Sequence, residues 1–342
     1  MPPEARPVRA AMGQDAWRAL PEAWRGTLAR LALAVAALMF AAAREWGEMA
    51  HQWWNIDTYN HVLLVPVIIV WLVRLRLDAL AQAEPRAWLP GLSLVAAALA
   101  LWGAGRITGI NLLAHAGAVG AVQGAVIALL GLRVAALLAL PLGFAVFLVP
   151  FGDEIIPALQ LVTADIAVAL TRWSGIPAEV ESIYIQTPVA LFIVAEACSG
   201  VKFLAAMVAL GVLVSFTRFE RWSRRAAFML AAIIVPILAN GVRAWGTIMV
   251  AHAYGVEFAE GFDHIVYGWV FFALVVAVLL GAAWPFFERE PEDHGWSPAA
   301  LDGSGFLARS EGKEARAAFP ALLAFAFVAA LFGAIAGFGP AG

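Results

Sequence analysis

Long apolar runs separated by short polar loops fill most of the chain. Most of them approach the roughly 20 residues that a helix needs to cross about 30 Å of hydrocarbon. Since the third run is short, the pattern predicts eight or nine membrane-spanning helices. The runs are 24–43, 61–77, 88–104, 110–130, 133–150, 198–217, 226–250, 264–287 and 317–338.

One longer segment, 151–195, interrupts this pattern. Its first part predicts an amphipathic helix outside the membrane, with Ile155, Ile156, Leu159, Val162, Ile166 and Leu170 at helical spacing. Two β-like runs follow, 180–186 and 189–195, with Thr187-Pro188 as the break between them. They fit a small β-hairpin that delivers the sixth apolar run to the membrane edge, and they fit an irregular re-entrant loop equally well.

The composition supports a membrane protein. Of the 342 residues 63% are hydrophobic and 14% are charged, and the mean hydropathy is +0.82. These values are too apolar for a soluble protein of this length, so the fold class is an all-α polytopic membrane protein. A single cysteine excludes a disulfide framework and a multi-cysteine metal site, and no His/carboxylate spacing suits a metal. We therefore expect no metal and no cofactor, and the lack of a basic patch argues against nucleic-acid binding.

Basic residues are distributed unevenly between the two sides of the membrane. With nine alternating spans, 17 Lys/Arg fall in one set of loops and only three, Arg44, Arg106 and Arg172, in the other. The positive-inside rule then places the N-terminus in the cytoplasm and the segment 151–195 outside. The predicted parts are a cytoplasmic tail at 1–23, which is not a signal peptide, a transmembrane domain at 24–287, a cytoplasmic linker at 288–316 and a C-terminal transmembrane helix at 317–342.

Cys198 stands where a polar turn enters the sixth apolar run. A lone cysteine more often fills space as a small buried apolar residue than it catalyses a reaction. Here Glu196, Ser199 and Lys202 lie within four residues of it, and polar groups at the edge of hydrocarbon are costly without partners or a role. This setting favours a functional cysteine.

Arg243 lies inside the seventh apolar run, which passes from the cytoplasm outward. Seven residues separate it from the end of the run, which predicts a depth of about 10 Å below the outer surface. A guanidinium in hydrocarbon costs at least about 2.5 kcal/mol, so it normally faces a polar cavity or a partner. The alternative is a side chain that snorkels to the outer interface.

His264 begins the eighth run on the outer side. Taken alone it would be an ordinary interfacial histidine, since Tyr267 and Trp269 beside it are typical of that region. The predicted topology, however, brings Cys198, Arg243 and His264 to the same outer face, at the ends of three consecutive helices.

These three side chains suit acyl transfer. An imidazole can deprotonate a thiol and return the proton to a departing amine, so His264 would act as base and then as acid for Cys198. Arg243 stays charged, and it would stabilise the thiolate and the oxyanion of the tetrahedral intermediate. We therefore expect a catalytic triad of Cys198, Arg243 and His264.

Three segments together resemble one family. They are Glu-Ala-Cys-Ser-Gly at 196–200, Asn-Gly-x-Arg at 240–243 and Asp-His-x-x-Tyr-Gly-Trp at 263–269. The chain resembles the exosortase/archaeosortase family over about 58–290, and is most similar to exosortase A. By this resemblance the supporting or substrate-binding residues are Glu196, Ser199, Gly200, Asn240, Asp263 and Tyr267. The sequence around His61 departs from the Ser-His-Gly expected of the family, which leaves a role for His61 open.

The resemblance implies a membrane-embedded cysteine protease and transpeptidase. It would cleave the C-terminal PEP-CTERM sorting signals of exported proteins through a Cys acyl-enzyme and pass the acyl group to an acceptor. The implied setting is the inner membrane of a Gram-negative bacterium, with the active site facing the periplasm and a link to exopolysaccharide and biofilm systems. Some relatives carry a further extracytoplasmic domain after a C-terminal helix, and the sequence leaves open whether one belongs here.

Three other classes fit parts of the pattern. An intramembrane arginine in a polytopic chain also suits a polysaccharide transporter or export component, but that class predicts charges spread through the membrane depth. A membrane O-acyltransferase would use His264 and would tolerate the loss of Cys198. A structural scaffold leaves Cys198 and Arg243 unexplained.

Overall fold

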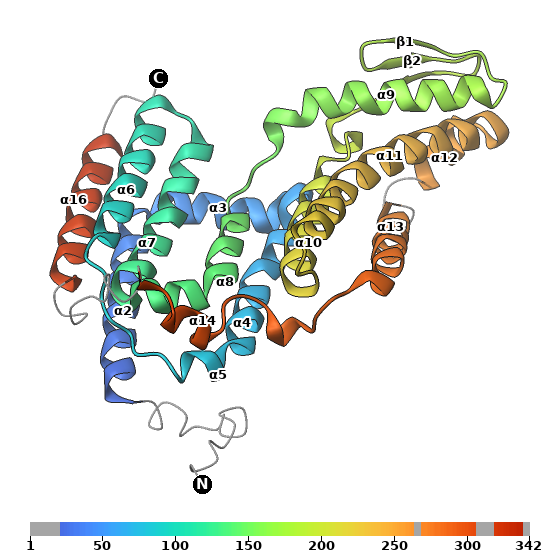
Figure 1. The fold of residues 1–342 in the computed structure, drawn as a ribbon. Helices are drawn as coiled ribbons and strands as arrows, with labels where there is room; N and C mark the ends of the chain where they lie inside the picture. The colour runs from blue at the N-terminus through green and yellow to red at the C-terminus, as the bar shows by residue number, and fades with distance from the viewer. Residues whose placement is uncertain (1–20, 263–267, 306–317, 338–342) are drawn as a thin grey trace. The chain divides into compact units, whose positions relative to one another are not determined.

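The computed structural model describes residues 21–262, 268–305 and 318–337, which are mostly helical (Figure 1). The chain divides into two compact units. Unit 1 comprises Met1–Pro150 and Pro291–Gly342, and unit 2 comprises Phe151–Glu290.

Unit 1 is built from helices alone in its described part. They are α2 (Glu22–Ala41), α3 (Ala43–Asn55), η2 (Asp57–Leu64), α4 (Val65–Leu75), α5 (Leu77–Leu80), α6 (Gly91–Thr108), α7 (Asn111–Leu137), α8 (Ala139–Phe144), η3 (Ala145–Leu148), η8 (Pro291–Asp293), α14 (Pro298–Asp302) and α16 (Phe319–Gly337).

The C-terminal helix α16 packs against α2 and α6, and α6 packs closely on α7 (Figure 1). Leu322 and Ala326 of α16 share a buried cluster with Ala34 and Leu38 of α2. The last apolar run therefore belongs to the core of unit 1 and does not stand apart from it.

The run 133–150, predicted as one span, is broken in the structure. Helix α7 is kinked at Gly131, which has a φ of 82°, and ends at Leu137, and the short helices α8 and η3 follow. At the kink the carbonyls of Ala128 and Leu130 accept hydrogen bonds from the backbone N–H groups of Trp88 and Arg86. A helix can break at membrane depth only if its freed carbonyls find such partners.

The broken run still returns to the side of the unit where α7 begins. At its end the carbonyl of Leu148 accepts a 3.0 Å hydrogen bond from the Trp53 indole of α3. Near the start of α7, His115 Nε2 lies 3.4 Å from Glu48 Oε2, also on α3. The chain therefore returns to that side of unit 1 without a single long helix, as the predicted alternation of loops between the two membrane sides requires.

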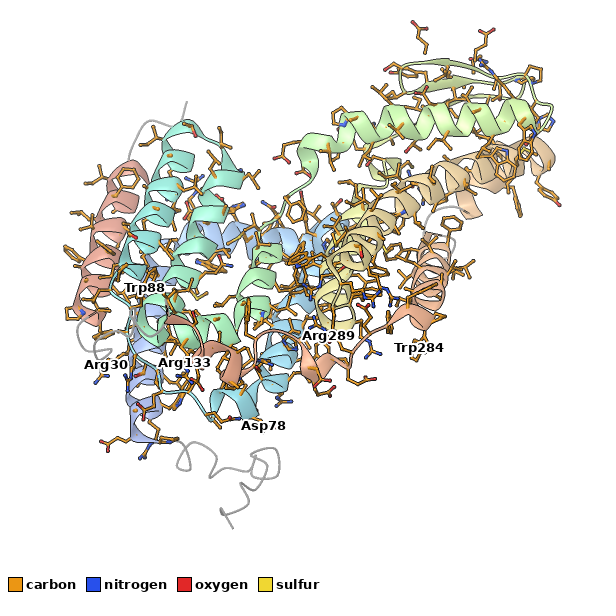
Figure 2. All side chains as sticks on the ribbon, viewed as in Figure 1. Arg30, Asp78, Trp88, Arg133, Trp284 and Arg289 are labelled. Atoms are coloured by element: carbon orange, nitrogen blue, oxygen red, sulfur yellow. The ribbon has the colours of Figure 1, made fainter. Side chains whose placement is uncertain are left out.

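Basic side chains gather at the opposite end of unit 1, where Figure 2 labels Arg30, Asp78 and Arg133. Arg76 is buried there and donates to the backbone carbonyls of Leu137, His294 and Trp296. These bonds attach residues after Pro291 to the end of α7.

Unit 2 combines helices with one small sheet. Its elements are η4 (Asp153–Ile155), α9 (Ile156–Trp173), β1 (Glu179–Glu181), β2 (Tyr184–Gln186), β3 (Leu191–Ile193), η5 (Glu196–Cys198), α10 (Val201–Arg218), α11 (Trp222–Tyr254), α12 (Val256–Phe262), α13 (Gly268–Ala283) and η7 (Trp284–Phe286).

The segment predicted as a two-stranded hairpin contains three antiparallel strands in the order β1-β2-β3. The run 180–186 itself folds back, with Glu181 opposite Tyr184 and Ser182 in the turn at a φ of 59°. A positive φ at the first of two turn residues suits a tight hairpin. The inner row of the sheet, Val180, Ile185 and Phe192, packs on α9.

Helix α9 packs only in part through the apolar residues that the spacing singled out. Ile155 and Val162 are exposed, whereas Leu159 is buried and small or polar residues make up most of the packed face. That face contains Leu159, Gln160, Thr163, Ala164, Ala167, Val168 and Thr171. Small residues allow two helix backbones to approach closely, and α9 lies beside the second half of α11 (Figure 1).

Within the described residues, seven helices are long and apolar enough to cross a membrane, or eight if one bent pair is counted as a span. One of the seven is the segment Asp153–Trp173, which contains α9 and was predicted to lie outside the membrane. A three-stranded sheet that does not close into a barrel is not found in hydrocarbon, and this sheet packs on α9. That α9 lies outside the membrane stays a prediction.

Candidate functional site

The only cysteine sits in a short helical turn directly before α10. The backbone N–H of Cys198 donates to Ala195 O at 2.8 Å and that of Ser199 donates to Glu196 O at 3.0 Å, which closes the turn η5. Gly200 then adopts a left-handed conformation with a φ of 85°, and α10 begins at Val201. The Cys198 side chain is partly exposed.

Asn240 of α11 holds this turn through a side-chain hydrogen bond. Its Nδ2 donates to the carbonyl oxygen of Cys198 at 2.8 Å and to Thr163 Oγ1 of α9 at 3.0 Å. Asn240 also packs on Gly200, where an added Cβ would lie 2.7 Å from Asn240 Cγ. Only a glycine leaves room for this contact, so the Ser-Gly pair after Cys198 and the Asn-Gly pair of α11 fit one another.

The pairing of α11 with α10 sets the position of Arg243 relative to the Cys198 turn. Helix α11 has 33 residues and is about 50 Å long, far more than the about 30 Å of hydrocarbon. Its first half pairs with α10, because Gly211 approaches Ala232 and Gly200 approaches Asn240. Arg243 therefore lies about one turn beyond the start of α10, and its depth in the membrane stays a prediction.

Arg243 is buried, with 7% of its surface exposed. Its guanidinium carbon lies 5.8 Å from the centre of the Phe203 ring, and Lys202 Nζ lies 5.3 Å from the same ring. A methyl group added at Gly268 would lie 3.4 Å from Arg243 Nη1. In the described part of the chain Arg243 Nε has no hydrogen-bond partner, so this nitrogen keeps a free donor.

Two polar residues of α9 belong to the site and were missed from the sequence. Gln160 Nε2 donates to Val194 O at 2.7 Å, and Thr163 Oγ1 donates to Ser199 O at 3.4 Å. Both side chains are buried. Their i, i+3 spacing, which places both side chains on one face of the helix, was the available signal.

The structure places the other predicted site residues differently. Ser199 is buried, and its Oγ accepts a 3.4 Å hydrogen bond from the N–H of Val201 at the start of α10. The Glu196 side chain is exposed, and His61 bonds the carbonyl of Thr58 in η2 of unit 1. Asp263, His264 and Tyr267 lie outside the described residues.

The chain has several apolar helices long enough to cross a membrane, which defines a multi-pass helical membrane protein. Its polar site is a turn that contains the single cysteine, at the start of one of these helices. The sequence matches the family described as transmembrane exosortase over residues 53–281, and the chain belongs to that family. Comparisons with curated proteins and with solved structures found no match. Membership indicates a membrane enzyme, and the matched residues include the Cys198 turn and Arg243.

Proposed function

We propose that this protein is a cysteine transpeptidase that removes a C-terminal sorting signal from exported proteins. The observation that carries the proposal is the arrangement around Cys198. Asn240 holds the cysteine's carbonyl, and the buried guanidinium of Arg243 follows one turn later on the same face of α11. A buried arginine whose Nε has no partner among the described residues, and a partly exposed thiol, suit a reaction that develops negative charge.

The first step forms a thioester. The sulfur of Cys198 attacks the carbonyl carbon of the scissile peptide, and His264 takes the thiol proton. The tetrahedral intermediate collapses, the C–N bond breaks, and the proton passes from His264 to the departing amine. An acceptor nucleophile or water then attacks the thioester while His264 takes its proton, the cysteine leaves as the thiolate, and His264 returns the proton to the sulfur. Gly268, which follows His264 by four residues, lies against Arg243 and supports this assignment.

Arg243 stabilises the oxyanion of both tetrahedral intermediates in this proposal. Loss of one oxyanion donor typically lowers kcat by about 10²–10³. Asn240 acts differently, because its amide bonds the backbone of the nucleophile and holds the turn in place.

The proposed substrates are exported proteins with a C-terminal PEP-CTERM signal, which comprises Pro-Glu-Pro, an apolar helix and a basic tail. This assignment follows from the resemblance to exosortase A and from family membership. The proposed location is the inner membrane, with the N-terminus in the cytoplasm and Cys198 facing the periplasm. The unequal distribution of Lys/Arg between loops supports that orientation.

The test is signal cleavage by Cys198→Ala. The side chain is partly exposed and small, so the variant should be obtained at normal yield, while cleavage should stop because the chain has no other thiol. Release of the signal by a folded Cys198→Ala protein would exclude the thioester mechanism and favour a membrane O-acyltransferase or hydrolase that uses His264.

The orientation has its own test, because the single cysteine is a unique label site. A membrane-impermeant maleimide should modify Cys198 in intact spheroplasts. Labelling in inverted vesicles alone would reverse the proposed topology.

A further inference from the structure

Helix α9 holds both ends of the segment that carries Cys198. Gln160 bonds the carbonyl of Val194, four residues before the cysteine, and Thr163 bonds the carbonyl of Ser199, one residue after it. Both side chains lie on the packed face of α9, and they are 8% and 1% exposed respectively.

Thr163 also links α9 to α11. Its hydroxyl accepts from Asn240 Nδ2 at 3.0 Å and donates to Ser199 O at 3.4 Å, while the same Nδ2 bonds Cys198 O. The carbonyls of two successive residues, Cys198 and Ser199, are thus fixed by one connected set of side chains from two helices. These carbonyls precede α10, in which the backbone N–H groups of Phe203 and Leu204 donate to the carbonyl of Gly200.

We propose that Gln160 and Thr163 are positioning residues, which set the place of the Cys198 sulfur and make α9 part of the catalytic machinery without touching substrate. The inference rests on the proposed transpeptidase function. A displacement of about 1 Å of a reacting group can cost about a hundredfold in rate, so loss of these bonds should lower kcat and leave substrate binding nearly intact.

The structure offers a matched control on the same helix. Thr171 is as deeply buried as Thr163, but its hydroxyl bonds only Ala167 O of α9 itself, at 2.7 Å. Thr163→Val and Thr171→Val make the same chemical change two turns apart. Thr163→Ser keeps the hydroxyl and serves as the conservative rescue.

Two measurements on purified full-length protein test the proposal. Steady-state cleavage of a signal-bearing substrate gives kcat and KM, and amide hydrogen exchange of the peptide that covers residues 194–200 reports the turn without substrate. We expect Thr163→Val to lower kcat by about tenfold to a hundredfold with KM within about twofold, and to speed exchange in that peptide. Thr171→Val should leave both kcat and the exchange rate of that peptide at their wild-type values. Thr163→Ser should keep most of the wild-type kcat.

Gln160→Met supplies a second variant if Thr163→Val does not fold, with the same expected results. The proposal is overturned if kcat stays at the wild-type value, if exchange of the turn is unchanged, or if Thr171→Val causes an equal loss. Failure of the proposed function would look different, since the wild-type protein would not cleave or Cys198→Ala would remain active.

Discussion

Gly200→Ala is the change whose cost can be worked most directly from the structure. Gly200 has a φ of 85°, and a left-handed conformation costs a residue with a Cβ about 1–2 kcal/mol. The new Cβ would also lie 2.7 Å from Asn240 Cγ and 2.9 Å from Asn240 Nδ2, so Asn240 must move. Overpacking of this kind typically adds about 1–3 kcal/mol. The total expected loss of unfolding free energy is about 2–5 kcal/mol.

Gly175→Ala separates the two contributions. Gly175 has nearly the same φ, 83°, but an added Cβ would meet nothing within 4 Å. It should therefore lose only the backbone part, about 1–2 kcal/mol. Equilibrium unfolding in mixed detergent micelles measures both variants. Because Asn240 bonds the carbonyl of Cys198, Gly200→Ala should also abolish most signal cleavage, whereas Gly175→Ala should not. Equal losses of stability in the two variants would refute the packing of Asn240 on Gly200.

Three further predictions concern other residues of unit 2. Arg243→Lys keeps a positive charge but removes the planar set of donors, so the rate of signal cleavage should fall by a factor of about 10²–10³ while the protein is obtained at normal yield. A variant that keeps more than about a tenth of the wild-type rate would show that Arg243 has a structural role only. Gly241→Ala places a Cβ 2.7 Å from Ile166 Cβ and should destabilise the protein by about 1–3 kcal/mol, with Ile166→Ala relieving part of the loss in the double variant. The backbone N–H of Arg221 holds the pKa of Glu288 below its usual value, so this carboxylate stabilises the fold at neutral pH and the contribution disappears as the pH falls through the lowered pKa. Glu288→Gln should therefore lower the thermal midpoint at pH 7 and leave it unchanged in strong acid; the same difference at both values would contradict this role.

Much of the fold follows from apolar runs, because each membrane-spanning helix must satisfy its own backbone and so leaves a long uninterrupted pattern. The pattern is less informative where a run breaks. No run of polar residues marks the kink at Gly131, because the carbonyls of Ala128 and Leu130 are satisfied by the backbone N–H groups of the distant residues Trp88 and Arg86. The turn at Ser182 was hidden for a related reason, because neither glycine nor asparagine marks it.

Part of the candidate site could be predicted from its sequence motifs, but several of the contacts that support it could not. The segment around Cys198 and the Asn-Gly pair of α11 come together as their motifs suggested. The apolar run gives the approximate length of α11, whereas the pairing with α10, which sets Arg243 about one turn beyond the start of α10, is seen only in the structure. Gln160 and Thr163 escaped notice because their partners are backbone carbonyls, which leave no trace in a sequence.

The central claim is that Cys198 carries the substrate as a thioester, and a trapped intermediate tests it most directly. Purified protein is mixed with a signal-bearing substrate, quenched in acid within the first turnover and mapped by peptide mass spectrometry. We expect the peptide that contains Cys198 to gain the mass of the substrate's N-terminal part, and hydroxylamine to remove it. Turnover of the substrate with an unmodified Cys198 peptide at every quench time would contradict the account.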